Sequence, residues 1–370
     1  MVDIFPLKPC QSPMQIPVPS VRLPRCAAYA SNIGDKEKAL TIYPAVVLVV
    51  AALIFGFLNG VQDAGNVVAT AISSRSMNWR QALVLNAIAH FCGPFLFGVA
   101  VATTIGQGLV APNTWTAPVI LAALLAAILW SLITWFFGIP SSSSHGLIGG
   151  ILGAVSVDFG LGGIQMHGLM KVMIALFLSP ILGLVVGRQL MQLILFLARE
   201  ASPGINQVFK RLQTFTTLIL ALTHGANDAQ KTMGIIAGSL VACGYQSEFS
   251  VARWVVAVSA GAMALGSMFG GWRVIKTVGS KFYKIRPVHS CAAQLSSAMV
   301  ILGAALLGVP VSTTQVVNSA TVGVGSAGRL SRVRWKIVRG ILLTWVLTIP
   351  ATTLLAALIY RLISRLLRAW

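Results

Sequence analysis

The feature that most constrains this chain is a series of long apolar segments that recurs along most of its length. A helix needs about 20 mostly apolar residues to cross the hydrocarbon core of a bilayer. We predict spanning segments at 42–60, 81–104, 116–137, 168–198, 214–243, 250–271, 289–308 and 336–360. Such long apolar runs exclude a β-barrel and predict an all-α polytopic membrane protein.

The charge of the chain fits a membrane protein better than a nucleic-acid-binding protein. Only 9% of the residues are charged, although the formal net charge is +19. The Lys and Arg side chains are spread over short loops and helix ends without interleaved aromatic residues, which favours membrane lipids over nucleic acid as partners. The basic segments 272–287 and 326–339 are expected on the cytoplasmic side. The five cysteines have no metal-ligand spacing and are interpreted as packing residues.

Two pairs of similar segments indicate an internal duplication. GFLNGVQDAGNVVATAI at 56–72 resembles ALTHGANDAQKTMGIIA at 221–237 and aligns Asp63 with Asp228. FFGIPSSSSHGLIGGILGAV at 136–155 resembles LLGVPVSTTQVVNSATVGVG at 306–325 and aligns Pro140 with Pro310. Interrupted apolar segments at matching places in two halves are typical of secondary transporters, whose site lies at the interface of the repeats.

We therefore predict four parts of the chain, of which the first is polar and rich in proline. They are a flexible N-terminal tail (1–41), a first transmembrane repeat (42–198), a linker (199–213) and a second transmembrane repeat (214–370). Each repeat is expected to contain a helix interrupted at its Asp motif, followed by a hydroxyl cluster after a proline.

The two aligned carboxylates are candidates for a cation site. Asp63 and Asp228 are the acidic residues placed inside apolar segments, where an ionisable group is costly unless it has a partner or a function. Asp63, Asn66 and Thr70 offer oxygen ligands on one helical face, as a hard cation needs. Lys231 takes the place that matches Asn66, so its ammonium could replace a cation. The alternatives are helix capping by each Asp and a structural pair of Lys231 with Asp228.

The hydroxyl clusters are candidates for an anion site. Ser141–Ser144 and Ser312–Thr314 follow prolines, so each cluster is expected at a helix N-terminus, where unpaired N–H groups and hydroxyls suit a tetrahedral oxyanion. Hydroxyl bonding to the helix backbone is the alternative. His145 and Gln315 follow the clusters at matching places, and His145 fits either proton relay or packing. His90 and His224 are weaker candidates.

Motifs of enzymes are missing from the sequence. It contains no GxSxG, HExxH or GxxxxGK[ST] pattern. We therefore expect no enzymatic activity, no cofactor and no ATP-driven transport, so transport would depend on ion gradients.

These ordered motifs resemble those of the inorganic phosphate transporter (PiT) family, whose duplicated signature is approximately GxNDxxNxxGT with a Pro-x-Ser-[ST]-[ST] turn. The resemblance covers about residues 42–360, and ALTHGANDAQKTMGIIAGSL is especially similar to bacterial low-affinity phosphate permeases. It implies an inverted-repeat fold with broken helices and re-entrant hairpins in the cytoplasmic membrane. It also implies symport of phosphate with H⁺ or Na⁺, and possible homodimers.

The resemblance also implies roles for individual residues. Those implied to bind phosphate are Ser142, Ser143, Ser144, Ser312, Thr313, Thr314, Asn227 and Lys231. Those implied to couple transport to a cation or proton are Asp63, Asn66, Thr70 and Asp228; a metal ligand set is not implied. Gln62, Ala69 and Lys231 depart from the family pattern. Lys231 is shared with proton-coupled permeases that can carry phosphate as a neutral metal complex, which favours H⁺ over Na⁺.

Three alternatives remain open at this point. A Na⁺-coupled phosphate symporter has the same motifs, and a permease for another oxyanion such as sulfate needs the same helix termini and hydroxyls. The third alternative is a channel or a membrane sensor. Channels usually build a pore from residues of several subunits, whereas here two halves of one chain supply the candidate site.

Overall fold

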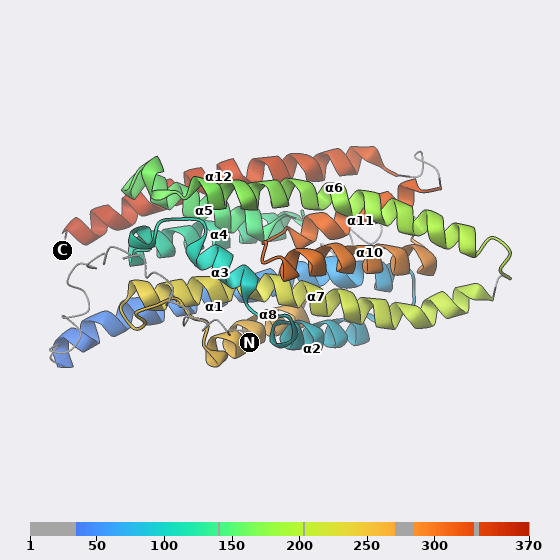
Figure 1. Cartoon of the computed structure of the whole chain (residues 1–370), viewed down its shortest axis with the longest axis horizontal. Helices are drawn as coiled ribbons and strands as arrows, with labels where there is room; N and C mark the ends of the chain where they lie inside the picture. The colour runs from blue at the N-terminus through green and yellow to red at the C-terminus, as the bar shows by residue number, and fades with distance from the viewer. Residues whose placement is uncertain (1–34, 140, 203, 271–284, 329–332, 370) are drawn as a thin grey trace, which may run out of the picture.

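The structure is a computed structural model that describes residues 35–139, 141–202, 204–270, 285–328 and 333–369. Within these ranges the chain forms one elongated bundle of helices (Figure 1). The helices are α1 (Asp35–Ser73), α2 (Trp79–Phe97), α3 (Ala100–Gln107), α4 (Ala117–Phe137), α5 (Ser143–Asp158), α6 (Met166–Leu197), α7 (Ile205–Ala242), α8 (Arg253–Phe269), α10 (Pro287–Leu306), α11 (Thr313–Ser326) and α12 (Trp335–Ala369).

Five of the described helices are long and apolar enough to cross a membrane, namely α1, α4, α6, α10 and α12. A sixth span results if α2 and α3, which are bent by 80° at a short break, count as one. The predicted segment 81–104 is therefore a bent pair, and the predicted segment 250–271 is the 17-residue helix α8. The outward faces of α6 and α12 expose large apolar side chains such as Phe177 and Leu354, as a lipid-facing surface requires.

Some predicted boundaries differ from the structure. Of the tail at 1–41, residues 1–34 lie outside the described residues, and α1 begins at Asp35. Within the predicted linker at 199–213, α7 begins at Ile205. Pro140 and most of the basic segment 272–287 also lie outside the described residues. The division into repeats at 42–198 and 214–370 stays a prediction.

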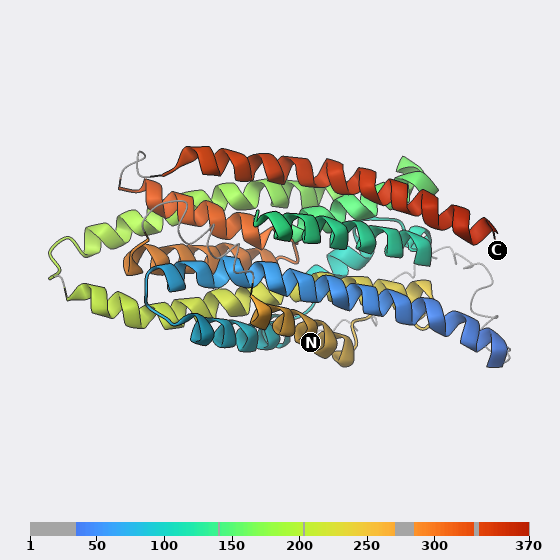
Figure 2. The same cartoon turned by 180° about the vertical axis from the view of Figure 1, so that it is seen from behind.

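Helices at matching places along the chain run in opposite directions. The order α1, α2, α4, α5, α6 corresponds to α7, α8, α10, α11, α12, and Figures 1 and 2 show that α1 runs opposite to α7 and that α6 runs opposite to α12. The contacts repeat in the same way, since α6 packs against α11 as α12 packs against α5, and α2 packs against α7 as α8 packs against α1. This arrangement confirms the duplicated, inverted-repeat fold.

Matching glycines produce the same close approach in both halves. A Cβ atom on Gly60 of α1 would overlap the backbone carbonyl of Met263 on α8. A Cβ atom on Gly225, which aligns with Gly60, would overlap the backbone of His90 on α2. The glycines in the two Asp motifs therefore let helices pack closely, as small residues do in membrane bundles.

We expect Gly60→Ala to lower the free energy of unfolding by about 1 to 3 kcal/mol, because the added methyl group overlaps backbone that cannot move aside cheaply. Gly303→Ala on α10 is the matched control, since its Cβ would meet no atom within 4 Å. Thermal unfolding of the purified protein in detergent measures both. Equal melting temperatures for the two variants would show that the close approach at Gly60 is not needed.

The prediction that the Asp motifs interrupt their helices is wrong. Both α1 and α7 continue through Asp63 and Asp228 without a break. The Gly residues nearby are held in helical geometry by the packing of neighbouring helices, which overrides their weak helix propensity.

The breaks lie instead before the hydroxyl clusters. Gly138 and Gly308 have φ values of 64° each, a left-handed conformation that glycine adopts without a Cβ clash, and they follow α4 and α10. The chain then turns into α5 and α11, which have 16 and 14 residues. At 1.5 Å per residue these helices are only about 24 and 21 Å long, less than the roughly 30 Å of a hydrocarbon core. In the hairpins α4–α5 and α10–α11, the second helix is therefore too short to cross the hydrocarbon core.

Candidate functional site

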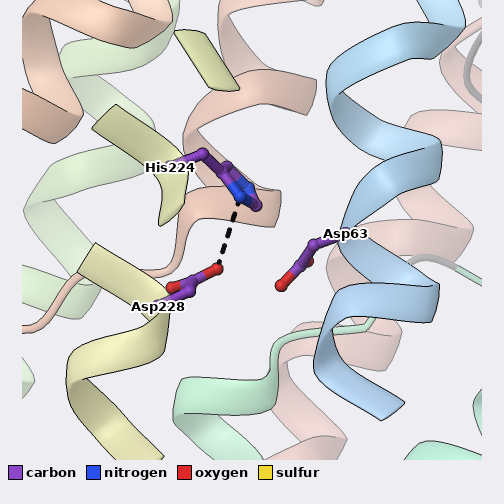
Figure 3. A group of neighbouring side chains, drawn as sticks. All are labelled: Asp63, His224 and Asp228. Carbon is purple, nitrogen blue, oxygen red and sulfur yellow. Dashed lines mark ion pairs between the residues drawn. The ribbon is translucent and has the colours of Figure 1, made fainter. Parts of the chain in front are cut away.

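The aligned carboxylates meet at the centre of the bundle. Asp63 comes from α1 and Asp228 from α7, and ligand atoms of Asp63, His224 and Asp228 all lie within 4.8 Å of one another. Figure 3 shows the two carboxylates and the imidazole pointing toward one another. Asp63 is 1% exposed and the other two are fully buried, so the group is shielded from solvent.

Lys231 connects Asp228 to the first hydroxyl cluster. Its Nζ atom lies 2.5 Å from Oδ1 of Asp228 and donates a hydrogen bond of 3.1 Å to Oγ of Ser143 on α5. The side chain of Lys231 is fully buried. A buried ammonium is therefore placed between a carboxylate of one helix and the N-terminus of a re-entrant helix from the other half.

The two hydroxyl clusters lie at helix N-termini, which confirms their predicted position. Oγ of Ser142 accepts a hydrogen bond from N of His145 at 3.2 Å, and Oγ of Ser312 accepts one from N of Gln315 at 3.4 Å. Both serines are therefore N-caps, of α5 and α11. The remaining N–H groups of each first turn have no partner within the helix and are available to an anion.

The cluster on α11 contacts both carboxylates. Thr313 donates a hydrogen bond of 2.6 Å to Oδ2 of Asp228, and Thr314 donates one of 3.0 Å to Oδ1 of Asp63. Nδ2 of Asn66 lies 3.1 Å from Oγ1 of Thr314 and 3.4 Å from Oδ1 of Asp63. One hairpin thus links the two aligned Asp motifs.

The tips of the two hairpins also contact each other. Ser144 donates a hydrogen bond of 2.9 Å to the carbonyl of Val311, and Nε2 of Gln315 lies 3.4 Å from Nε2 of His145. The other ring nitrogen of His145 lies 2.7 Å from Oγ of Ser142. His145 therefore has hydrogen-bond partners on both sides and holds the two tips together.

Thr70 and Asn227 do not join this group of contacts. Thr70 lies seven residues after Asp63, about 10 Å along the helix, whereas a hard cation binds its ligands at about 2.0 to 2.6 Å. One ion therefore cannot contact both side chains. The carbonyl of Thr70 accepts a hydrogen bond of 3.4 Å from Gln213 instead. Asn227 is buried, and its amide has no hydrogen-bond partner among the described residues.

The structure gives the weaker candidates His90 and His224 their contacts and adds Gln230, which the sequence analysis did not single out. The rings of His90 and His224 stack with centroids 5.4 Å apart, and Nδ1 of His90 lies 2.7 Å from Oγ of Ser267 on α8. Gln230 accepts hydrogen bonds of 2.8 and 3.2 Å from the N–H groups of Val101 and Ala102, so it caps the first turn of α3. The polar type of Gln230 inside a predicted membrane-spanning segment was the available signal, and it does not identify the partner of Gln230.

The charges in the site do not balance. Two ionised carboxylates and one ammonium leave one negative charge in a buried place, and an unpaired buried charge costs several kcal/mol. The ammonium lies beside Asp228, whereas Asp63 has no cationic partner within ion-pair distance among the described residues. One further cation would complete the balance, either at Asp63 or on His224, whose Nδ1 lies 3.6 Å from Oδ2 of Asp228. Oδ2 of Asp63 and Oδ1 of Asn66 have no hydrogen-bond partner among the described residues.

Comparison with known protein families identifies one whose sequence model matches most of this chain. The model described as "Phosphate transporter family" matches residues 59–356, which include both Asp motifs and both hydroxyl clusters. The chain belongs to the phosphate transporter family. The protein is therefore a transporter of the membrane rather than an enzyme, and its several apolar helices make it a multi-pass membrane protein.

Relatives of this phosphate transporter family member are found in several bacteria. A probable low-affinity inorganic phosphate transporter of Rhizobium meliloti (strain 1021) is 43% identical over 87% of this chain and 97% of its own length. A protein of the same name from Bacillus subtilis (strain 168) is 42% identical over 86% of this chain and 97% of its own length. A solved structure titled "The sodium-dependent phosphate transporter" has the same fold, with a TM-score of 0.79, 24% identity, and coverage of 87% of this chain and 99% of its own.

Proposed function

We propose that the protein carries inorganic phosphate across the cytoplasmic membrane together with a proton. Membership of the phosphate transporter family and the names of the bacterial relatives support phosphate as the cargo. The observation that carries the proposal is the pairing of one uncompensated carboxylate, Asp63, with two hydroxyl-bearing helix N-termini. A cation and an anion would thus be bound side by side, as symport requires.

Phosphate would lie between the N-termini of α5 and α11. Their hydroxyls and first-turn N–H groups donate hydrogen bonds, and the ammonium of Lys231, already 3.1 Å from Ser143, supplies the positive charge. Thr313 and Thr314 donate to the carboxylates in this state, so they would exchange those partners for phosphate oxygens. The other implied phosphate ligands are Ser142, Ser144, Ser312 and Asn227.

The carboxylates favour phosphate over sulfate. A phosphate that carries a proton can donate a hydrogen bond to a carboxylate oxygen, whereas sulfate at neutral pH carries no proton to donate. A sulfate ion beside the ionised carboxylate of Asp228 would have no proton to donate to it and would be repelled by its charge. Sulfate is the second candidate cargo, because helix N-termini and hydroxyls bind both anions.

The coupling ion follows from the role of Lys231. Its ammonium supplies the cation beside Asp228, so one site remains, at Asp63. A proton on Asp63 neutralises that site without the set of oxygen ligands that Na⁺ needs, and Thr70 is too far along α1 to complete such a set. We therefore favour H⁺ over Na⁺. A neutral complex of phosphate with a metal ion is a second form in which the same cargo would be carried.

The site is closed in this state. Every side chain that contacts a carboxylate or a hydroxyl in the group is at most 6% exposed. Access from either side therefore needs a movement of the repeats, as in alternating access.

Uptake of labelled phosphate into proteoliposomes tests the cargo. We expect uptake that depends on the protein and persists in a large excess of unlabelled sulfate, with empty liposomes as the control. Competition by sulfate at a similar concentration to phosphate would instead assign the protein to general oxyanion transport.

The double variant Ser143→Ala with Thr313→Ala should weaken phosphate binding by about 100-fold, because two hydrogen bonds to a charged ligand are lost. The matched control is Ser296→Ala with Ser297→Ala on α10, whose hydroxyls are buried but donate only to carbonyls of their own helix. The concentration of phosphate that gives half-maximal uptake measures both variants. An unchanged value in the first variant would place the anion site elsewhere.

A further inference from the structure

A buried polar network lies beside the site in one half of the molecule. Thr216 donates a hydrogen bond of 2.7 Å to Oε1 of Gln294, whose Nε2 donates one of 2.9 Å to Thr217. Gln213 donates a hydrogen bond to Ser290. These five side chains come from α7 and α10, and each is at most 8% exposed.

The matching places in the other half are all apolar. The alignment of Asp63 with Asp228 and of Pro140 with Pro310 extends along the paired helices α1 and α7, and α4 and α10. It pairs Gln213 with Leu48, Thr216 with Ala51, Thr217 with Ala52, Ser290 with Ile120, and Gln294 with Leu124. These five apolar residues all belong to one buried core cluster.

The fold alone does not require the polar set. The apolar set shows that Leu, Ala and Ile fill the same places in the same architecture. Burial of amides and hydroxyls in a membrane bundle has a desolvation cost and brings little net stability. Buried polar residues that face the interior of a membrane protein commonly mark the path of a substrate or ion.

Thr70 contacts the network and lies seven residues after Asp63 on α1. Its carbonyl accepts a hydrogen bond from Gln213, and its hydroxyl is 2% exposed with no hydrogen-bond partner among the described residues. Ser74, which directly follows α1, donates a hydrogen bond of 2.9 Å to Oε1 of Gln213. Polar groups therefore continue along α1 from Asp63 toward its C-terminal end.

The network faces the more basic end of the bundle. Figure 1 shows that α6 ends, and that α7 and α12 begin, at the same right-hand end. The exposed basic residues at this end, which we call the basic end, are Arg75, Arg80, Arg199, Lys210, Arg211, Arg286, Arg334, Lys336 and Arg339. An excess of Lys and Arg indicates the cytoplasmic side of a membrane protein.

We propose that this network lines the passage through which phosphate leaves the site toward the cytoplasm, an inference that rests on the proposed function. Its side chains bond to one another while the passage is closed, and they exchange these bonds for water and phosphate when it opens. The opposite side is closed by the apolar cluster that contains Leu48 and Leu124, which keeps water out until the helices separate.

Accessibility of matched cysteines tests the passage. Thr217→Cys and Ala52→Cys are placed separately in a chain whose five native cysteines are replaced by serine or alanine. A charged, membrane-impermeant methanethiosulfonate reagent is then applied to each side of oriented vesicles. We expect Thr217→Cys to react from the side of the basic end, at least about tenfold faster than Ala52→Cys reacts from either side.

Phosphate uptake by the same vesicles before labelling separates this proposal from the proposed function. If the vesicles take up phosphate and the two cysteines react equally, or Ala52→Cys reacts faster, the passage is wrong while phosphate transport stands. If the vesicles of the cysteine-free chain fail to take up phosphate but the wild-type vesicles succeed, Gln294→Leu in the wild-type chain decides instead.

Gln294→Leu installs the residue that stands at the matching place in the other half. We expect the maximal rate of phosphate uptake to fall by about tenfold with unchanged phosphate binding, because the desolvated passage raises the barrier to exit. Thr348→Val on α12 is the control, since this buried hydroxyl donates only to a carbonyl of its own helix. An unchanged rate in Gln294→Leu overturns the proposal.

Discussion

Asp63→Asn is expected to abolish accumulation of phosphate driven by a proton gradient while preserving exchange of phosphate across the membrane. The amide imitates a permanently protonated carboxyl group, so the hydrogen bond of 3.0 Å from Thr314 to this side chain can persist. The variant therefore keeps a neutral, occupied coupling site that can no longer gain or lose a proton. We expect net uptake against a gradient to fall by at least about 100-fold.

Counterflow of labelled against unlabelled phosphate in proteoliposomes measures exchange separately from accumulation. The control is Asp158→Asn at the C-terminal end of α5, an acidic residue outside the group of contacting side chains. If Asp63→Asn accumulates phosphate as the wild type does, Asp63 is not the coupling residue. If exchange is lost as well, the carboxylate is needed for phosphate binding rather than for coupling.

Lys231→Met is expected to lower phosphate affinity by about 100-fold and the free energy of unfolding by about 3 to 5 kcal/mol. The substitution leaves Asp228 buried without the ammonium that lies 2.5 Å from it, and removes the positive charge beside Ser143. Half-maximal uptake concentration and thermal unfolding in detergent measure the two effects. Lys171→Met on α6 is the control, because Lys171 is exposed.

A double variant separates charge balance from phosphate binding. Lys231→Met with Asp228→Asn removes both members of the buried pair, so most of the lost stability should return while phosphate affinity stays low. Recovery of both properties would mean that Lys231 serves only to neutralise Asp228. Recovery of neither would mean that the packing of this region, rather than its charge, was disturbed by the substitutions.

The sequence predicts the architecture well because repetition is visible in the residues themselves. Alignment of Asp63 with Asp228 and of the two hydroxyl clusters predicted matching elements, and the structure adds that they are antiparallel. The Gly-x-Pro pattern also predicted the hairpin turns, since left-handed Gly138 and Gly308 are a local property of the chain.

The sequence does not reveal whether a glycine breaks a helix or permits close packing. The Asp motifs that contain Gly60 and Gly225 were expected to interrupt their helices, but a neighbouring helix from the other half packs into the space left by each glycine. The residue that packs against Gly60 is Met263, which lies far away along the chain, so the sequence around the glycine does not reveal the close packing.

Residue types in the site were predictable, whereas their partners were not. Lys231 was expected near Asp228 because one helical turn separates them. The hydrogen bond from Thr314 to Asp63 joins residues of different halves and depends on how the α10–α11 hairpin packs against α1. Thr70 matches the pattern of helical spacing but lies too far along α1 to share an ion with Asp63, which the rise of the helix would have revealed.

Accumulation of labelled phosphate by the wild-type protein tests the central claim of proton-coupled phosphate symport most directly. Proteoliposomes with the membrane potential clamped receive a pH gradient in sodium-free buffer, a sodium gradient at equal pH, or neither, and Asp63→Asn provides the uncoupled reference under each condition. We predict that the pH gradient alone raises wild-type accumulation above the reference, by about tenfold per pH unit for one coupled proton. Accumulation that follows the sodium gradient and not the pH gradient would contradict it.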